Sequence, residues 1–239
     1  MSFQLLTLKS IRARPVVLKL RRPVAARIAM LTHWPLILID LYTEEGVIGR
    51  SYLEPYIPKS MRYLIPALHD LGEMLKGRRL APLETYEAGR KSLHFVGYEG
   101  MAMIAVAGID MAAWDALARA AGVPLCALLG SSIGPVPAYN SNGLWLRSPN
   151  EVASEAVELR EEDGFKGLKL RLGRERLADD LATIEAVRDA VGSEMSLMVD
   201  STKGFTSARR WNGATQSTIW ASPGSRSLSS TTTSKATLG

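Results

Sequence analysis

The sequence predicts an α+β unit over residues 1–130, followed over residues 131–206 by a second unit in which strands and helices alternate. In the first unit, strand-like segments precede a run of helices, which is typical of an α+β domain. In the second unit, the pattern changes after Gly134 to a βαβαβ series, which is typical of α/β proteins with parallel strands. The last segment, residues 207–239, carries neither pattern.

The first unit opens with two β-like regions, residues 5–20 and 36–53. The second region contains LILIDLYT, a turn at residues 44–46 and VIGRSYL, which together predict a hairpin. Residues 58–76 place apolar side chains at helical spacing on one face, and residues 83–93 are expected to form another helix.

The longest patterned stretch, residues 105–130, reads AVAGIDMAAWDALARAAGVPLCALLG. Its apolar residues recur at helical spacing, and its small residues would let the helix pack closely against a neighbour. Gly122 should end this helix, and residues 125–129 should form a second short turn.

In the second unit, the expected elements alternate along the chain: strand 136–140, helix 151–162, strand 167–172, helix 177–191 and strand 196–200. Ser148 and Asn150 are alternative caps for the first of these helices. Gly164 and Gly192 should close the two helices.

Composition indicates a soluble globular protein, with 46% hydrophobic and 22% charged residues in 239. The net charge of +5 falls to +1 without residues 209–239, which hold four basic residues and no acid, so we expect no nucleic-acid partner. Charges interrupt the long apolar stretches and the N-terminus lacks a signal-peptide pattern, so we expect a cytoplasmic protein without a membrane partner. The single cysteine, Cys126, excludes an internal disulfide and is expected to be a buried hydrophobe.

The stretch 105–130 follows the pattern A-x-A-G-I-D-x-A-A-x-D-A-x-A-R, then P-L-x-x-L-L-G. This pattern resembles the signature of the mandelate racemase and muconate lactonizing enzyme family of the enolase superfamily. The segments PLILIDLYTEEGVIGRSYLEPY, LAPLETYEA and VPAYNSNG extend the resemblance, which covers residues 1–206 and is closest to the mandelate racemase branch. It implies an N-terminal capping domain followed by the first strands and helices of an incomplete (β/α) TIM-type barrel.

Lys169 and Arg171 lie two apart on the expected strand GLKLRL, so both side chains point to the same face. Taken alone, they could be two solvated cations on a half-exposed strand. The resemblance implies instead that they match the K-x-K motif of the family, in which the first lysine neutralises the substrate carboxylate and the second exchanges the α-proton. In this chain the second position is Arg171. Arginine keeps its proton at neutral pH, so Arg171 is a poor base and favours chemistry with one base, such as dehydration of a hydroxy acid.

Asp200 ends the expected strand SLMVDS, and carboxylates at the C-terminal ends of barrel strands gather metal ions. It could also be an N-cap or turn aspartate. The resemblance implies that Asp200 is a Mg²⁺ ligand, with the metal stabilising the negative charge formed when the proton α to a carboxylate leaves.

The same resemblance implies substrate contacts for Tyr56, in SYLEPY, and for Ser141, at the end of the first barrel strand. Residues 23–34 correspond to the mobile lid that sets the substrate class in this family.

Residues 209–239 contain 13 serines or threonines and no acid, a composition typical of a disordered segment. We favour a second hypothesis, a frameshift after about Ser207, which makes residues 207–239 a non-native tail. When each codon is read from its third base, the segment from Trp220 to Leu228 can encode G-F-A-W-I-E-E-P. W-I-E-E-P resembles the family motif that carries the second metal ligand.

The resemblance, together with these residues, implies a metal-assisted enzyme that removes the α-proton of a 2-hydroxy carboxylate or sugar acid, by racemisation or dehydration. Its partners would be a small-molecule carboxylate and, as the resemblance implies, further copies of itself in a homo-oligomer. Because the remaining metal ligands are missing, we expect the truncated chain to be inactive as it stands. The alternative is a non-catalytic fragment or pseudogene product.

Overall fold

The computed structural model describes residues 5–25, 30–95, 97–201, 217–221 and 229–230. The chain folds as two compact units. Unit 1 comprises Met1–Lys19 and His33–Pro135, and unit 2 comprises Leu20–Thr32 and Val136–Gly239. Residues 20–32 therefore group with the second unit, although they precede most of the first unit in the sequence.

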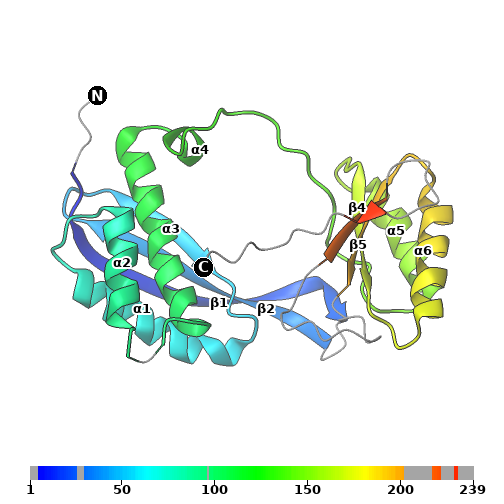
Figure 1. The fold of residues 1–239 in the computed structure, drawn as a ribbon, viewed down its shortest axis with the longest axis horizontal. Helices are drawn as coiled ribbons and strands as arrows, with labels where there is room; N and C mark the ends of the chain where they lie inside the picture. The colour runs from blue at the N-terminus through cyan, green and yellow to red at the C-terminus, as the bar shows by residue number, and fades with distance from the viewer. Residues whose placement is uncertain (1–4, 26–29, 96, 202–216, 222–228, 231–239) are drawn as a thin grey trace. The chain divides into compact units, whose positions relative to one another are not determined.

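A three-stranded sheet has the order β1-β2-β3, formed by Leu8–Ala25, Met30–Thr43 and Ile48–Leu53 (Figure 1). Most of it lies in unit 1, whereas the end of β1 from Leu20 and the start of β2 up to Thr32 belong to unit 2. The hairpin predicted at LILIDLYT is confirmed: β2 and β3 pair antiparallel from Ile37↔Leu53 to Tyr42↔Ile48. Within the expected lid, residues 23–25 end β1 and residues 30–34 begin β2, whereas residues 26–29 lie outside the described part of the chain.

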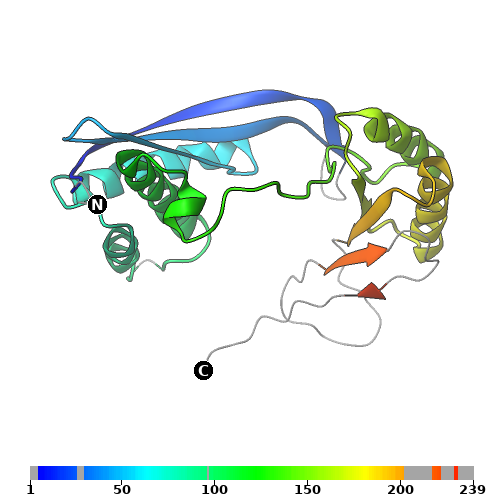
Figure 2. The same cartoon turned by 90° about the horizontal axis from the view of Figure 1, so that it is seen from above.

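Helices cover one face of this sheet (Figure 2): α1 Met61–Leu75, preceded by the 3-10 turn η1 Pro58–Ser60, then α2 Pro82–Ser92, α3 Met101–Ala121 and α4 Leu125–Leu128. The core forms where the alternate residues Ile37, Ile39 and Leu41 of β2 meet the apolar faces of α1 and α3. Gly122 adopts the left-handed conformation at the end of α3, as predicted. Cys126 is exposed, so the expectation of a buried hydrophobe is wrong; none of the four residues of α4 is buried.

The small residues of α3 bring it very close to β3. A Cβ atom on Gly49 would lie 2.0 Å from the carbonyl oxygen of Ala112 and 2.8 Å from the Cβ of Ala116. By length and composition, helix α3 is also apolar enough to cross a membrane, but its inner face lies in the core of unit 1.

Unit 2 contains α5 Pro149–Glu161, β4 Gly167–Leu172, α6 Leu177–Val191 and β5 Ser196–Ser201. Strands β4 and β5 are parallel and pair from Gly167↔Ser196 to Leu172↔Ser201. Helices α5 and α6 pack together on one face of these strands (Figure 2).

The ends of these helices follow the predicted chemistry in part. Ser148 is the N-cap of α5 and forms a reciprocal capping box with Glu151, which decides between the two predicted caps; Asn150 lies inside the helix. Gly192 caps α6, whereas Gly164, at φ 66°, lies two residues beyond the cap of α5 at Glu162.

The strand predicted at residues 136–140 is reduced to a single parallel bridge, Asn140↔Leu168. Within residues 136–140, Asn140 alone is bonded to β4 among the backbone hydrogen bonds described: its N–H donates to the carbonyl of Gly167 and its carbonyl accepts from the N–H of Lys169. Residues 131–139 are exposed. In the tail, the backbone of β6 Ser217–Ala221 pairs antiparallel with β5, and β7 Ser229–Ser230 pairs with β6. These two short strands form where the sequence carries no strand pattern, because the edge of β5 offers unpaired backbone groups. Most of residues 207–239 lie outside the described part of the chain.

Candidate functional site

Lys169, Arg171 and Asp200 form one cluster, because β4 and β5 are neighbours in a parallel sheet and the register sets Arg171 opposite Asp200. The Nζ of Lys169 lies 3.6 Å, and the Nε of Arg171 lies 4.0 Å, from the same oxygen of Asp200, Oδ2. The three side chains are 18%, 11% and 16% exposed. Two cations and one carboxylate are therefore held together with little access to water.

Each cation also faces an aromatic ring. The Nζ of Lys169 lies 5.5 Å from the ring centre of Tyr139, and the guanidinium carbon of Arg171 lies 4.4 Å from that of Trp145. Such contacts stabilise a cation that is partly removed from water. The sequence analysis did not predict either ring contact. Both aromatic residues flank Asn140, which lies beside β4, and this position in the sequence could have indicated them.

Arg171 remains a cation in spite of its burial. Burial lowers the pKa of Arg171, and the nearby carboxylate of Asp200 opposes that shift. Because the ordinary pKa of arginine is above about 12, the side chain remains protonated at neutral pH. Its Nη1 donates to the backbone carbonyl of Lys169 at 2.9 Å, which orients the planar group along the strand.

Asp200 has one oxygen available for a ligand. Its Oδ1 is buried and has no hydrogen-bond partner among the described residues, whereas Oδ2 faces the two cations. A hard carboxylate oxygen in this state suits Mg²⁺, so Asp200 fits the metal as a single ligand. The described part of the chain holds no group of three His, Cys, Asp or Glu side chains placed to bind a metal.

The two predicted substrate contacts lie in different units. Ser141 follows Asn140 in unit 2 and is half-buried. Tyr56 lies in unit 1, where it is 64% exposed, has a φ of 62° and meets Trp34 edge to face at 6.4 Å. Among the described contacts, neither residue forms a hydrogen bond or ion pair with Lys169, Arg171 or Asp200.

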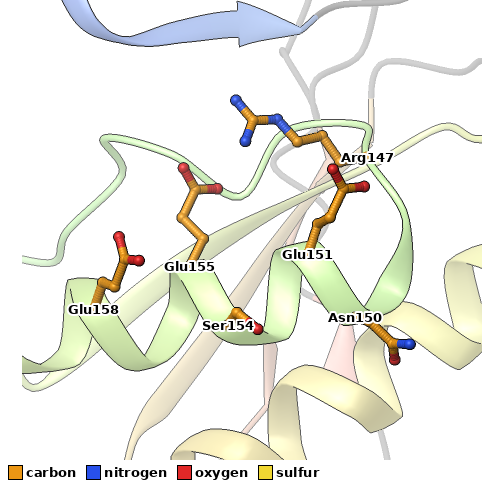
Figure 3. Close-up of a pocket in the computed structure, with 6 residues that line it drawn as sticks. All are labelled: Arg147, Asn150, Glu151, Ser154, Glu155 and Glu158. Atoms are coloured by element: carbon orange, nitrogen blue, oxygen red, sulfur yellow. The ribbon is translucent and has the colours of Figure 1, made fainter.

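A pocket of about 410 Å³ lies apart from this cluster, along α5 (Figure 3). Its lining consists of polar residues: Arg147, Asn150, Glu151, Ser154, Glu155 and Glu158. Glu151, Glu155 and Glu158 project from one side of the helix, and Arg147 comes from the segment before it (Figure 3).

Comparison with known families gives two matches along the chain. Residues 9–130 match the N-terminal domain of the mandelate racemase / muconate lactonizing enzyme family. The chain belongs to this family. Residues 151–218 of this family member match the enolase C-terminal domain-like family. Residues 9–130 are thus the sheet-and-helix capping domain of the family, and residues 151–218 contain the start of its barrel domain.

Several solved structures resemble this family member. An enolase from alpha proteobacterium BAL199 with bound magnesium is 65% identical, with a TM-score of 0.78 over 81% of this chain and 54% of that one. An enolase from Bradyrhizobium in complex with magnesium and mandelic acid is 33% identical, with a TM-score of 0.75 over 83% of this chain and 54% of that one. The family member therefore spans about half the length of these structures.

Among curated proteins, L-talarate/galactarate dehydratase from Salmonella typhimurium is 42% identical over 106 residues, which are 44% of this chain and 27% of the relative. Other relatives are sugar-acid dehydratases, cycloisomerases and dipeptide epimerases. The family member thus resembles enzymes that act on several kinds of small molecule.

Proposed function

We propose that this chain carries the carboxylate-binding part and one metal ligand of an active site that removes the proton α to a carboxylate, in a 2-hydroxy acid or sugar acid. The observation that carries the proposal is the pairing of Lys169 and Arg171 with Asp200 across adjacent strands. Relatives named as dehydratases of galactarate, arabinonate and galactonate support this substrate class. So does a related structure that holds magnesium and mandelic acid.

In this proposal, Lys169 and Arg171 bind the carboxylate of the substrate. A planar guanidinium can hold a carboxylate through two parallel hydrogen bonds, and the ammonium of Lys169 adds a second positive charge. Low exposure to water strengthens both attractions. Positive charge at this point favours loss of the neighbouring proton, because negative charge then builds up on the carboxylate.

Asp200 would hold Mg²⁺ through Oδ1, the oxygen without a hydrogen-bond partner. When bound, the metal would supply further stabilisation of the same developing charge. Asp200 also orients the two cations through Oδ2. In this proposal, one oxygen of Asp200 binds the metal and the other orients the two cations.

Arg171 disfavours a racemase with two bases. A lysine in its place could lose its proton in a cationic, partly dry site and act as a base, but arginine does not. We therefore propose chemistry with a single base, such as dehydration, and propose that the base comes from outside Lys169 and Arg171. We also propose that this chain alone does not turn over, because one acidic ligand seldom holds Mg²⁺ firmly.

Binding of mandelate to the chain tests whether Lys169 and Arg171 bind the carboxylate of the substrate. In NMR titrations with mandelate, we expect weak binding that is lost in Lys169→Met and Arg171→Met. The matched control is Lys166→Met, which removes an exposed lysine from the residue before β4. Binding that is equal in all four proteins would exclude the cluster as the carboxylate site.

Two measurements test the statement on turnover. Calorimetry with Mg²⁺ should show no micromolar binding, and mandelate incubated with the chain and Mg²⁺ in D₂O should keep its α-proton. Exchange of one enantiomer would show an active enzyme with one base and overturn the expected inactivity. Exchange of both enantiomers would in addition overturn the proposal of a single base.

A further inference from the structure

The turn that carries Trp145 has a strained backbone. Leu144 is fully buried and has a φ of 55°, in the left-handed region that non-glycine residues rarely adopt. Such a conformation persists only where the surrounding structure holds it. The next residue, Trp145, packs its ring against the guanidinium of Arg171. The position of this ring therefore depends on whatever holds Leu144.

Glu155 holds the turn from the side of α5. Its Oε2 accepts a hydrogen bond from the backbone N–H of Leu144 at 2.8 Å, and its side chain is only 9% exposed. Its Oε1 lies 3.7 Å from the Nε of Arg22, which supplies a counter-charge. The turn approaches the carboxylate so closely that a Cβ atom on Gly143 would lie 3.0 Å from it.

The other side of the turn is held by Arg174. Its Nε and Nη2 donate to the carbonyl of Arg147 at 2.9 and 2.8 Å, and its Nη1 pairs with Asp180 at 3.1 Å. The carbonyl of Leu144 accepts from the N–H of Arg171 at 3.0 Å, so the turn is also bonded directly to β4.

We propose that Glu155 is a positioning residue for Arg171, acting through the hydrogen bond to Leu144 that sets the ring of Trp145. Without an acceptor at residue 155, the buried N–H of Leu144 has no partner, and the left-handed backbone relaxes. Trp145 then leaves the guanidinium, and Arg171 loses the contact that fixes its plane. The expected effect on carboxylate binding rests on the proposed function. The expected effect of Glu155 on the position of Trp145 does not.

The first experiment follows Trp145 without any ligand. The five tryptophans are labelled with 5-fluorotryptophan, and Trp145→Phe identifies the resonance of interest. Glu155→Met keeps the shape of the side chain but removes the acceptor, so we expect the Trp145 resonance to move toward that of Arg171→Met. Glu155→Gln keeps an acceptor oxygen, so we expect the wild-type position.

The matched control is Glu158→Gln. Glu158 lies on the same helix and its Oε2 is 3.6 Å from Arg22, but it is 69% exposed and does not bond the turn. It should leave the Trp145 resonance unchanged. A Trp145 resonance that stays in place in Glu155→Met would overturn the proposal. An equal movement in Glu155→Gln would also overturn it, because the effect would then come from the charge of Glu155 and not from its hydrogen bond.

Two further measurements complete the test. If Glu155→Met does not fold, the exchange rate of the Leu144 amide proton is measured in the wild type and in Glu155→Gln. Slow exchange in both proteins supports the hydrogen bond to residue 155. Fast exchange in the wild type overturns it. Mandelate titration then separates the two proposals. Glu155→Met should weaken binding about tenfold, with Glu155→Gln near the wild type. If Trp145 moves as expected but the wild type binds no mandelate, the positioning role stands and the proposed function fails.

Discussion

The replacement Asp200→Asn should destabilise unit 2, because it leaves two partly buried cations without their carboxylate. Lys169 Nζ and Arg171 Nε lie 3.6 and 4.0 Å from Oδ2. At an effective dielectric constant of about 20, each contact corresponds to about 4–5 kcal/mol of attraction. The cost of burying the charges offsets much of this gain, and losing one partner of a buried pair costs about 3–5 kcal/mol. Since the amide oxygen keeps a partial negative charge toward the two cations, we expect a loss at the lower end of this range, about 3 kcal/mol in the free energy of unfolding.

The matched control is again Glu158→Gln. Its carboxylate lies 3.6 Å from Arg22, the same separation as for Lys169 and Asp200, but it is 69% exposed. Exposed pairs contribute about 0–1 kcal/mol, so this variant should unfold almost as the wild type does. Arg22 also keeps Glu155 and Glu162 as partners, so the control measures the loss of an exposed carboxylate that leaves no cation unpaired.

Urea denaturation followed by the fluorine resonance of Trp145 measures the unfolding of unit 2. Adding mandelate should stabilise Asp200→Asn more than the wild type, because the two cations no longer have an internal anion and a bound ligand stabilises the folded state. A loss no larger than that of Glu158→Gln would mean that water screens the cluster, which would refute the electrostatic argument. Equal stabilisation by mandelate in both proteins would refute the role of the cations in binding it.

Three further results are expected. Gly49→Ala should destabilise unit 1 by about 3 kcal/mol or more in thermal unfolding, because the helix backbone would lie 2.0 Å from the new methyl group. Ser148→Ala should cost about 1 kcal/mol and speed amide exchange in the first turn of α5, because it removes the capping box. The hydrogen bond from Arg22 lowers the pKa of Glu162 below its ordinary value of 4.5, so its contribution to stability is present above that pH and is lost as the pH falls through the lower value. Glu162→Gln should therefore remove part of the acid dependence of unfolding measured between pH 5 and about pH 2.

Each of these has a clear contrary result. An unchanged melting temperature in Gly49→Ala would mean that β3 and α3 separate at no cost. Unaltered exchange in Ser148→Ala would show that the remaining helix contacts fix its first turn. An acid transition in Glu162→Gln that matches the wild type would assign the acid sensitivity to other carboxylates.

Much of the fold follows from local pattern. The expected limits of β4 and α6, residues 167–172 and 177–191, agree with the structure, because alternating and helical spacing of apolar residues set which face is buried. The predicted strand 136–140 is wrong except at Asn140, because this residue alone forms a bridge to β4 among the described residues. A strand needs a neighbouring strand for its backbone hydrogen bonds, and the pattern of apolar residues does not predict whether one lies beside it.

The amino-acid sequence by itself determined the order of elements, the family, and the placement of Lys169 and Arg171 on one face of a strand. Tertiary structure decided their surroundings. It brought Asp200 within 4.0 Å of both cations and placed the ring of Trp145 on Arg171. It also bonded Glu155 to the turn before Trp145. Periodicity records only what repeats within an element, whereas these contacts join separate elements, and their distances depend on strand register and helix packing.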